Sequence, residues 1–261
     1  MTRGRVGALA LVFLVALAAT APFVARYQPD GLDLDSRRQA PSRAHWFGTD
    51  ELGRDVFARV LYGARISLAV GLLSAAVAGA SGLTIGGAAG YAGGALDGVL
   101  MRMTDAVIAV PRLPLLMIAA AVLRPSVALL VLLIGLASWM ETARVTRAEC
   151  LSLRAREFVD AARAVGAGHI RLLTKHLLPN AAPAIAVSVT LAVGRAILLE
   201  SALSFFGVGV RPPQASWGNM LYQAQATLGT EPWLALFPGL FIFVTALSVN
   251  LVGDTLAARQ P

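Results

Sequence analysis

Two ionisable residues stand inside an apolar stretch, where their charges could act on a passing solute. Arg195 and Glu200 interrupt residues 181–206. A charge at the centre of a bilayer costs roughly 3 kcal/mol or more, so it normally faces protein or a water-filled cavity. The two lie about 140° apart around a helix, so no direct pair is expected. Arg195 could line a translocation path and attract a substrate carboxylate, or it could snorkel to the membrane surface or bond to a neighbouring carbonyl. Glu200 could line the path or pack against a partner.

Other side chains that commonly carry chemistry are scattered along the chain. His45, His169, His176 and the single Cys150 fall in different segments. The phosphate-cradling pattern G-x-x-x-x-G-K-[ST] does not occur, and the only lysine, Lys175, follows Thr174. We therefore expect no catalytic residues, no metal site and no cofactor bound by this chain, which is not an enzyme by itself.

The composition indicates lipid as the surrounding medium. Of the 261 residues, 57% are hydrophobic and only 14% are charged, with a mean hydropathy of +0.68. A soluble domain carries about 25% charged residues. The net charge of +7 is spread between apolar segments, without the aromatic and basic platform of a nucleic-acid binder. Membrane lipid is an expected partner and nucleic acid is not.

About 20 predominantly apolar residues are needed to cross a bilayer as a helix. The sequence predicts an all-α integral membrane protein with six such spans. Pro22 argues against cleavage of the first as a signal peptide. The third is expected to bend near Pro111 and Pro114. The spans are residues 6–25, 66–96, 104–123, 127–146, 181–206 and 232–253.

The distribution of arginine predicts how the chain is oriented. Six spans place both termini on one side, which the positive-inside rule assigns to the cytoplasm. Residues 1–25 then form the first anchor, and residues 26–65 form an outer loop. In that loop Val56, Val60 and Leu61 suggest an amphipathic segment lying along the outer surface. Residues 66–256 form a five-helix core, and residues 257–261 form a short cytoplasmic tail.

Small residues and charges mark two further helix faces. Gly82, Gly86, Gly90 and Gly94 recur every fourth residue in the second span, which favours close helix packing over a sliding contact. Three charged residues close the fourth span, where a solvated helix end is the simplest expectation. They are Glu141, Arg144 and Arg147.

Residues 155–180 form a charged insert between the fourth and fifth spans. A first helix is expected over 155–165, with an apolar stripe made of Phe158, Ala161, Ala162 and Val165. Gly166 and Gly168 permit a turn. A second helix over 169–178 would present Ile170, Leu173 and Leu177 and stop at Pro179. Periodicity alone leaves open a solvated interfacial loop or a hairpin that binds a partner.

The amino-acid sequence of this insert resembles a known motif. "DAARAVG" followed by "HLLP" resembles the EAA loop of the membrane subunits of ATP-binding-cassette importers. Asp replaces Glu at the first position. Residues 45–68, 198–221 and 233–256 resemble the C-type permease of dipeptide and oligopeptide importers. The positions that match the EAA spacing are Asp160, Ala161, Ala162, Gly166, Leu178 and Pro179.

The resemblance implies the fold of a type I ABC importer permease, with a cytoplasmic coupling helix at the insert. It implies a heterodimer with a second homologous permease, two ATPase subunits that bind ATP and magnesium, and an external solute-binding protein. The location would be the cytoplasmic membrane of a bacterium or archaeon. The implied cargo is di- and oligopeptides, with nickel, glutathione or another small solute as alternatives. A stand-alone secondary transporter or a scaffold would leave the EAA spacing unexplained.

Overall fold

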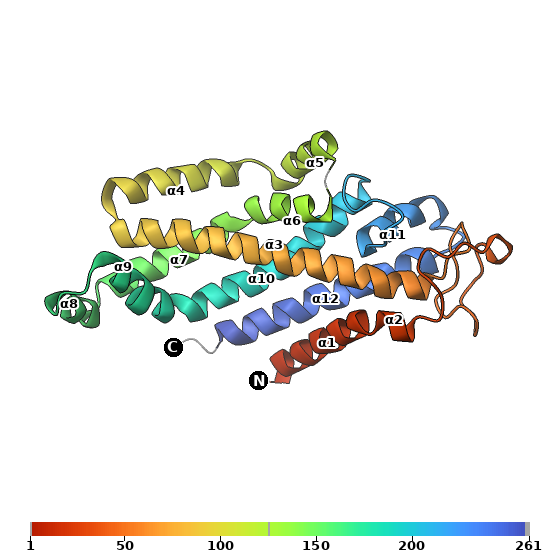
Figure 1. Ribbon diagram of the computed structural model, residues 1–261, viewed down its shortest axis with the longest axis horizontal. Coiled ribbons are helices and arrows are strands. Elements are labelled where there is room, and N and C mark those ends of the chain that lie inside the picture. The colour runs from red at the N-terminus through yellow and green to blue at the C-terminus, as the bar shows by residue number, and fades with distance from the viewer. Residues whose placement is uncertain (1, 125, 259–261) are drawn as a thin grey trace.

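The computed structural model describes residues 2–124 and 126–258, and within these ranges it contains helices, turns and loops but no strand (Figure 1). The last three residues of the expected tail, 259–261, lie outside the described residues. The larger helices are α1 (Thr2–Ala19), α3 (Val56–Ala92), α4 (Gly94–Ala109), α5 (Arg112–Leu123), α6 (Val127–Leu136), α7 (Trp139–Arg154), α10 (Leu178–Phe205) and α12 (Trp233–Ala257). The shorter elements are α2 (Ala21–Val24), η1 (Leu34–Ser36), α8 (Glu157–Ala164), α9 (His169–Arg171), the π-turn η2 (Leu172–Leu177), α11 (Trp217–Ala224) and η3 (Gln225–Thr227).

Within the described residues, three helices are long and apolar enough to cross a membrane. They are α3, the continuous helix His169–Phe205 that comprises α9, η2 and α10, and α12. The bent pairs α4–α5 and α6–α7 raise the number to five. With the 18-residue apolar α1, the expected six-helix arrangement is confirmed. The 37 residues of α3 span about 55 Å, well beyond a hydrocarbon core of about 30 Å.

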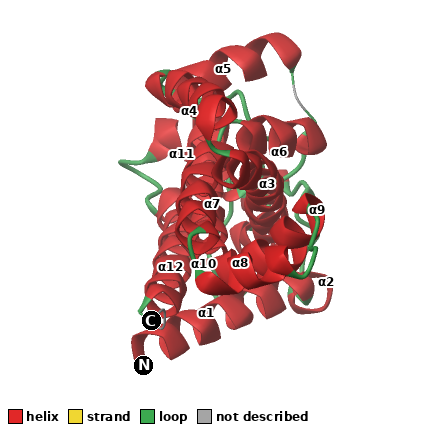
Figure 2. Cartoon of the chain, turned by 90° about the vertical axis from the view of Figure 1, so that its left-hand side faces the viewer, coloured by secondary structure: helices red, strands yellow, loops and turns green. Residues whose placement is uncertain are grey.

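Helix α3 forms the centre of the bundle. It packs against α1, α6, α7 and α10, and it carries the largest set of buried side chains of any helix. Seen from the end that bears α8, α4 and α5 lie on one side of the bundle and α1 lies on the other (Figure 2). Trp217 of α11 is fully buried beside α3, and its indole Nε1 donates a hydrogen bond to the carbonyl of Val60 at 3.1 Å.

The start of α3 corrects one expectation. Val56, Val60 and Leu61 were expected in an amphipathic segment along the membrane surface, but they are buried in the first turns of α3. Asp55 caps this helix by accepting a hydrogen bond from the backbone N–H of Ala58 at 2.8 Å. The helix therefore begins ten residues before the expected start of the span, because Asp55 is a good N-cap for a helix that starts at Val56.

The third and fourth spans are both broken. Helices α4 and α5 meet at an angle of 80° next to Pro111, so the expected bend is confirmed but is far sharper than a kinked span. Pro114 lies in the first turn of α5, where backbone N–H groups have no partner within the helix. The missing N–H of proline therefore costs no helical hydrogen bond. Helices α6 and α7 meet at 43° around Ser138, and α7 continues to Arg154, past the expected end at 146.

The glycines of α3 allow α7 to approach closely. A Cβ added at Gly82, Gly86 or Gly90 would collide with backbone atoms of α7, namely those of Trp139, Ala143 and Arg147. The expected packing face is confirmed for these three positions. Gly94 does not belong to it, because α3 ends at Ala92 and Gly94 begins α4.

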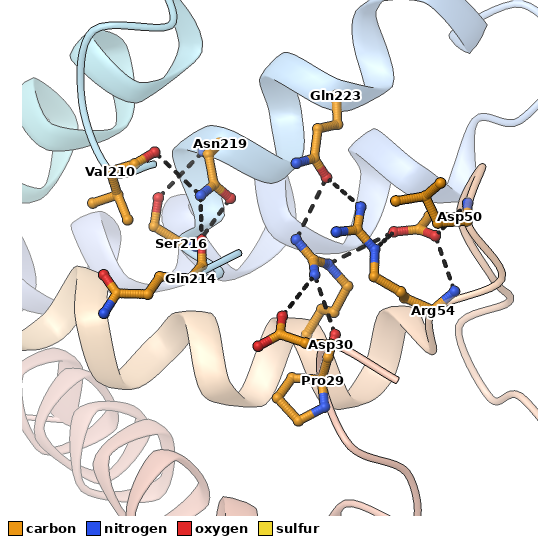
Figure 3. A network of polar contacts seen from close by, with 11 residues as sticks. Pro29, Asp30, Asp50, Arg54, Val210, Gln214, Ser216, Asn219 and Gln223 are labelled. Atoms are coloured by element: carbon orange, nitrogen blue, oxygen red, sulfur yellow. Dashed lines mark hydrogen bonds and ion pairs between the residues drawn. The ribbon is translucent and has the colours of Figure 1, made fainter. Parts of the chain in front are cut away.

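A buried polar network fixes the loop before α3 at the end of the bundle opposite α8 (Figures 1 and 3). Arg59 is 1% exposed and donates to the carbonyl of Pro29 at 3.1 Å, to Asp30 at 3.4 Å and to Gln223 of α11 at 3.5 Å. Arg54 pairs with Asp50 at 2.6 Å. These contacts join the loop, α3 and α11 into one polar cap.

Candidate functional site

Two regions hold the site residues that the sequence singles out. One is the helical hairpin made of α8, the following turn and the start of helix His169–Phe205, which protrudes at one end of the molecule (Figure 1). The other is a set of charged side chains inside the bundle.

The hairpin turn follows the Schellman geometry of helix ends. The N–H of Ala167 bonds to the carbonyl of Ala162 at 3.0 Å, and the N–H of Gly166 bonds to that of Arg163 at 2.9 Å. Gly166 has a φ of +85°, in the left-handed region that favours glycine. No atom outside its chain neighbours lies within 4 Å of a Cβ built there. The backbone conformation, and not crowding, therefore requires glycine at this position.

The inner face of the hairpin packs on the end of the bundle. Val159 and Ala162 of α8 are buried against Cys150, Leu172 and Leu177. A helical hairpin is thus confirmed. Its small core attaches it to α7 and to the π-turn at the start of the long helix, so it is not a freely solvated loop.

The apolar stripes expected on the two helices are buried only in part: Ala162 and Leu177 belong to this core and Leu173 packs against it, whereas other members are exposed. Phe158, Val165 and Ile170 are 40%, 86% and 80% exposed, respectively. The buried face of α8 is formed by Val159 and Ala162, because α7 and η2 cover only that side of the helix. The three exposed side chains point away from this core, and we call them the outward face of the hairpin. Exposed apolar side chains of this size often mark a protein contact.

The residues of the EAA spacing are divided between the two faces of the hairpin, with Ala162 in its core and Leu178 packed against that core. Asp160 and Ala161 are exposed on α8, and Asp160 accepts a hydrogen bond from Arg163 at 3.0 Å. Leu178 is partly buried at the start of α10. Pro179 was expected to stop the second helix. This expectation is wrong, because the helix continues past Pro179 to Phe205. The π-turn Leu172–Leu177 precedes this proline and shifts the backbone bonds that a proline would otherwise break.

The charges inside the bundle are paired in a way that the sequence did not reveal. Glu141 of α7 accepts a hydrogen bond from Arg112 of α5 at 2.6 Å, and its second oxygen lies 2.7 Å from Arg195 of α10. Arg195 thus forms an ion pair and does not bond to a neighbouring carbonyl. As expected, Arg195 and Glu200 do not pair with each other.

The three charged residues expected at a solvated helix end lie well before the end of α7 and are ion-paired, with Arg144 half-exposed. Arg144 pairs with Asp105 of α4, and Arg147 binds Asp97 of α4 with two hydrogen bonds. Together with Glu141 these residues form a ladder of ion pairs that ties α7 to the bent pair α4–α5. The earlier expectation is wrong because the partners come from a helix that folds back alongside α7.

Glu200 lies in the interior of the chain. Glu200 is fully buried, and its carboxyl accepts hydrogen bonds from the hydroxyl groups of Ser67 at 3.0 Å and Ser204 at 2.8 Å. Ser67 in turn accepts the N–H of Trp217 at 3.2 Å, and Ser204 accepts that of Val210 at 3.0 Å. This placement contradicts both readings of Glu200, in the pathway or against a partner. It holds α3, α10 and α11 together.

Several residues that organise this region escaped the sequence reading. Ser67 looks like any small residue of a membrane span, and Arg59 looks like a charge of a surface helix. Asn219 reads as an ordinary loop residue but completes a capping box with Ser216 and donates to the carbonyl of Gln214 at 2.6 Å (Figure 3). The S-x-x-N pattern at the start of an apolar helix could have identified Asn219 as a capping residue.

The arrangement can bind and transmit but offers little for catalysis. Among the described residues, no group of three or more His, Cys, Asp or Glu side chains is placed to hold a metal ion. His45 bonds to Asp55 at 2.9 Å and stacks on Tyr27, which makes it part of the polar cap. What remains is a protruding hairpin with an apolar outward face and a charged cluster on three helices.

Comparison with known proteins supplies a family. Residues 82–260 match the family described as "Binding-protein-dependent transport system inner membrane component". A protein of Brucella suis, named as a candidate peptide permease, is 43% identical over 252 residues, which cover 96% of this chain and 83% of the relative. A candidate permease of a peptide transport system in Brucella melitensis is 39% identical, covering 97% and 85%. The oligopeptide transport system permease protein OppC of Bacillus subtilis is 38% identical, covering 96% and 82%.

Proposed function

This chain belongs to the family of binding-protein-dependent transport system inner membrane components, and we propose that it is a permease subunit of an ATP-driven importer of di- and oligopeptides. The proposed cargo follows the names of its relatives, which are peptide and oligopeptide permeases aligned over nearly the whole chain. The alternatives are an importer of nickel, glutathione or another small solute.

The outward face of the hairpin is the observation that carries this proposal. Phe158, Val165 and Ile170 expose apolar surface on a compact helical body that is anchored to the bundle by its other face. A partner protein that covers the outward face can move the hairpin as a unit. We assign this partner as an ATPase subunit, one of two on the cytoplasmic side. The residues of the coupling loop are Asp160, Ala161, Ala162, Gly166, Leu178 and Pro179.

The remaining partners follow from the family. The chain would pair with a second homologous permease, and an external solute-binding protein would deliver the cargo. ATP and magnesium would bind to the ATPase subunits, since this sequence has no phosphate-cradling loop.

The orientation is also a proposal. Gly4 of α1 lies against Thr255 of α12, so the start of α1 and the end of α12 are neighbours, and Figure 1 draws both on the side of the bundle nearer to α8. With the ATPase at α8, both termini would be cytoplasmic. Arg3 and Arg5 agree with this assignment.

The cargo is tested by uptake in cells with and without this chain. We expect uptake of a labelled dipeptide to be lost on deletion and restored by the wild-type gene, with nickel uptake unchanged. Loss of nickel uptake alone, with dipeptide uptake intact, would replace the peptide assignment by the nickel alternative. Intact uptake of both would remove the support for either cargo.

The ATPase contact is tested by co-purification. Val165→Asp puts a charge on the outward face and should sharply reduce the amount of ATPase that purifies with the permease. Leu228→Asp is the matched control, since Leu228 is 53% exposed and lies after η3, away from the hairpin. Equal ATPase recovery from both variants would contradict the assignment of the hairpin.

A further inference from the structure

Three helices bring one acid and two arginines together. Arg112 begins α5, Glu141 belongs to the first turn of α7, and Arg195 lies in α10. Each arginine places one Nη2 within 2.7 Å of a different oxygen of Glu141. We call these three residues the Arg–Glu–Arg cluster.

The cluster lies near the middle of the bundle, and we take this level as the centre of the bilayer. Gly71 of α3 lies against Ile197, two residues beyond Arg195, and Gly82 lies against Thr142, next to Glu141. Thr142 also bonds to Ser188 of α10 at 3.0 Å. The cluster therefore falls between the levels of Gly71 and Gly82, around the midpoint of the 37-residue α3.

At this depth the cluster is open on one side. The side chains of Arg112, Glu141 and Arg195 are 24%, 36% and 39% exposed, respectively. Partly exposed charges at mid-bilayer are too costly in contact with lipid tails, and they face protein or water instead. This side of the chain, formed by α5, α7 and α10, therefore faces a water-filled path or another protein.

The ion pairs around α7 leave one positive charge unmatched. Four arginines bind three carboxylates there: Arg144 has Asp105, Arg147 has Asp97, and Arg112 and Arg195 share Glu141. Each guanidinium carries five N–H donors; Arg112 donates one to Glu141, and Arg195 contacts the other carboxylate oxygen with one nitrogen. The cluster thus has spare donors and a net charge of +1 that suits one further anion.

We propose that the Arg–Glu–Arg cluster is a carboxylate-binding site on the translocation path, and that it takes the C-terminal carboxylate of a peptide. This inference rests on the proposed peptide importer. Glu141 holds the two guanidinium groups in place and lowers the local charge from +2 to +1. A passing carboxylate is attracted but can leave again, as a transport site requires.

The test compares two probes in the complete transporter reconstituted in liposomes, with its second permease, ATPases and binding protein. The probes are labelled alanyl-alanine and the same dipeptide with a C-terminal amide. Because every variant uses the same binding protein, the ratio of the two uptake rates, relative to wild type, reports on the permease.

Arg195→Gln should lower this acid-to-amide ratio by about tenfold, the fold-change expected for loss of one charged hydrogen bond. Arg195→Lys should keep much of the ratio, because the charge remains. Glu141→Gln should act in the opposite direction and lower the KM for the free acid, since it removes the competing carboxylate. Arg147→Gln is the control, because it removes an ion-paired arginine from the same ladder outside the cluster.

A fall in uptake of both probes by the same factor in Arg195→Gln would overturn the carboxylate site. Weaker co-purification of the second permease in that variant would instead assign the cluster to the contact between permeases, and would also overturn it. If the wild-type transporter moves neither probe, the peptide proposal itself fails, and this inference fails with it. If wild type moves both and the variants keep its ratio, only this inference fails.

Discussion

Gly86 of α3 lies so close to the backbone carbonyl of Ala143 in α7 that a single added methyl group would collide with it. This contact predicts a penalty for the smallest possible substitution. Gly86→Ala should destabilise the protein by about 1–3 kcal/mol, because a backbone carbonyl cannot move aside as a side chain can. Thermal unfolding of the purified protein in detergent measures the effect.

Gly98→Ala is the control for this measurement. Gly98 lies in α4, and nothing lies within 4 Å of a Cβ built there. Both substitutions bring the same gain in helix propensity, about 1 kcal/mol. A lower melting temperature for Gly86→Ala than for Gly98→Ala isolates the helix contact. Equal melting temperatures would show that α3 and α7 can separate at no cost.

The turn of the hairpin predicts a difference between two neighbouring glycines. Gly166→Val should impair coupling, because its φ of +85° costs a residue with a Cβ about 1–2 kcal/mol and a β-branched residue more. Gly168→Val should be mild, since Gly168 has an ordinary φ of −69° and both sites have room. Dipeptide uptake and ATPase co-purification are measured for both. Normal uptake by Gly166→Val would remove the turn from the coupling loop.

Glu200 is predicted to act in folding and not in transport. Glu200→Ala leaves the hydroxyl groups of Ser67 and Ser204 without their acceptor, and each unsatisfied buried group costs about 1–3 kcal/mol. Glu200→Gln keeps one oxygen and adds donors, so it should lose much less stability. Exposed Glu51 supplies the control variant Glu51→Ala.

Transport distinguishes this role from a pathway role. Glu200→Gln that folds normally should transport dipeptide at close to the wild-type rate. A stable Glu200→Gln variant with strongly reduced uptake would return Glu200 to the translocation path.

The polar cap predicts a protease-sensitive variant. Arg59→Met breaks a buried ionic network by removing one partner, which typically costs about 3–5 kcal/mol. The loop before α3 loses its bonds from Arg59 to Pro29 and Asp30, so limited proteolysis should cut residues 26–55 faster. Arg65→Met, at an exposed position two turns further along α3, should leave the cleavage rate unchanged. Equal cleavage of both variants would show that Arg59 does not hold the loop.

Most of the helical architecture could be predicted from the sequence, because lipid makes the length of an apolar run informative. The turn at Gly166 could also be predicted, since helix ends need a left-handed residue. Helix ends near proline could not. Pro179 stops a regular helix by local rules, yet the π-turn before it lets the helix continue. Pro111 marks a bend, but the residue type alone does not give its angle of 80°.

The buried charges escaped prediction for a different reason. Arg112 and Glu141 are 29 residues apart in sequence, and Ser67 and Glu200 are 133 apart. Such pairs exist only once the helices are placed, so no local spacing reports them. The buried face of α8 could be predicted only in part, with Ala162 inside and Phe158 and Val165 exposed, because in a helix of eight residues α7 and η2 decide which side is covered.

The second arm of the hairpin and Arg195 belong to one uninterrupted helix, His169–Phe205. Mechanically this is a lever. A helix of 37 residues is about 55 Å long, and a tilt of about 5° around its middle displaces each end by about 2 Å. The same tilt moves Arg195, which lies eight residues from the middle, by about 1 Å, provided that the π-turn at the base of the hairpin does not absorb the movement. The stiffness of the six residues in this π-turn therefore sets how much of the hairpin's movement reaches Arg195.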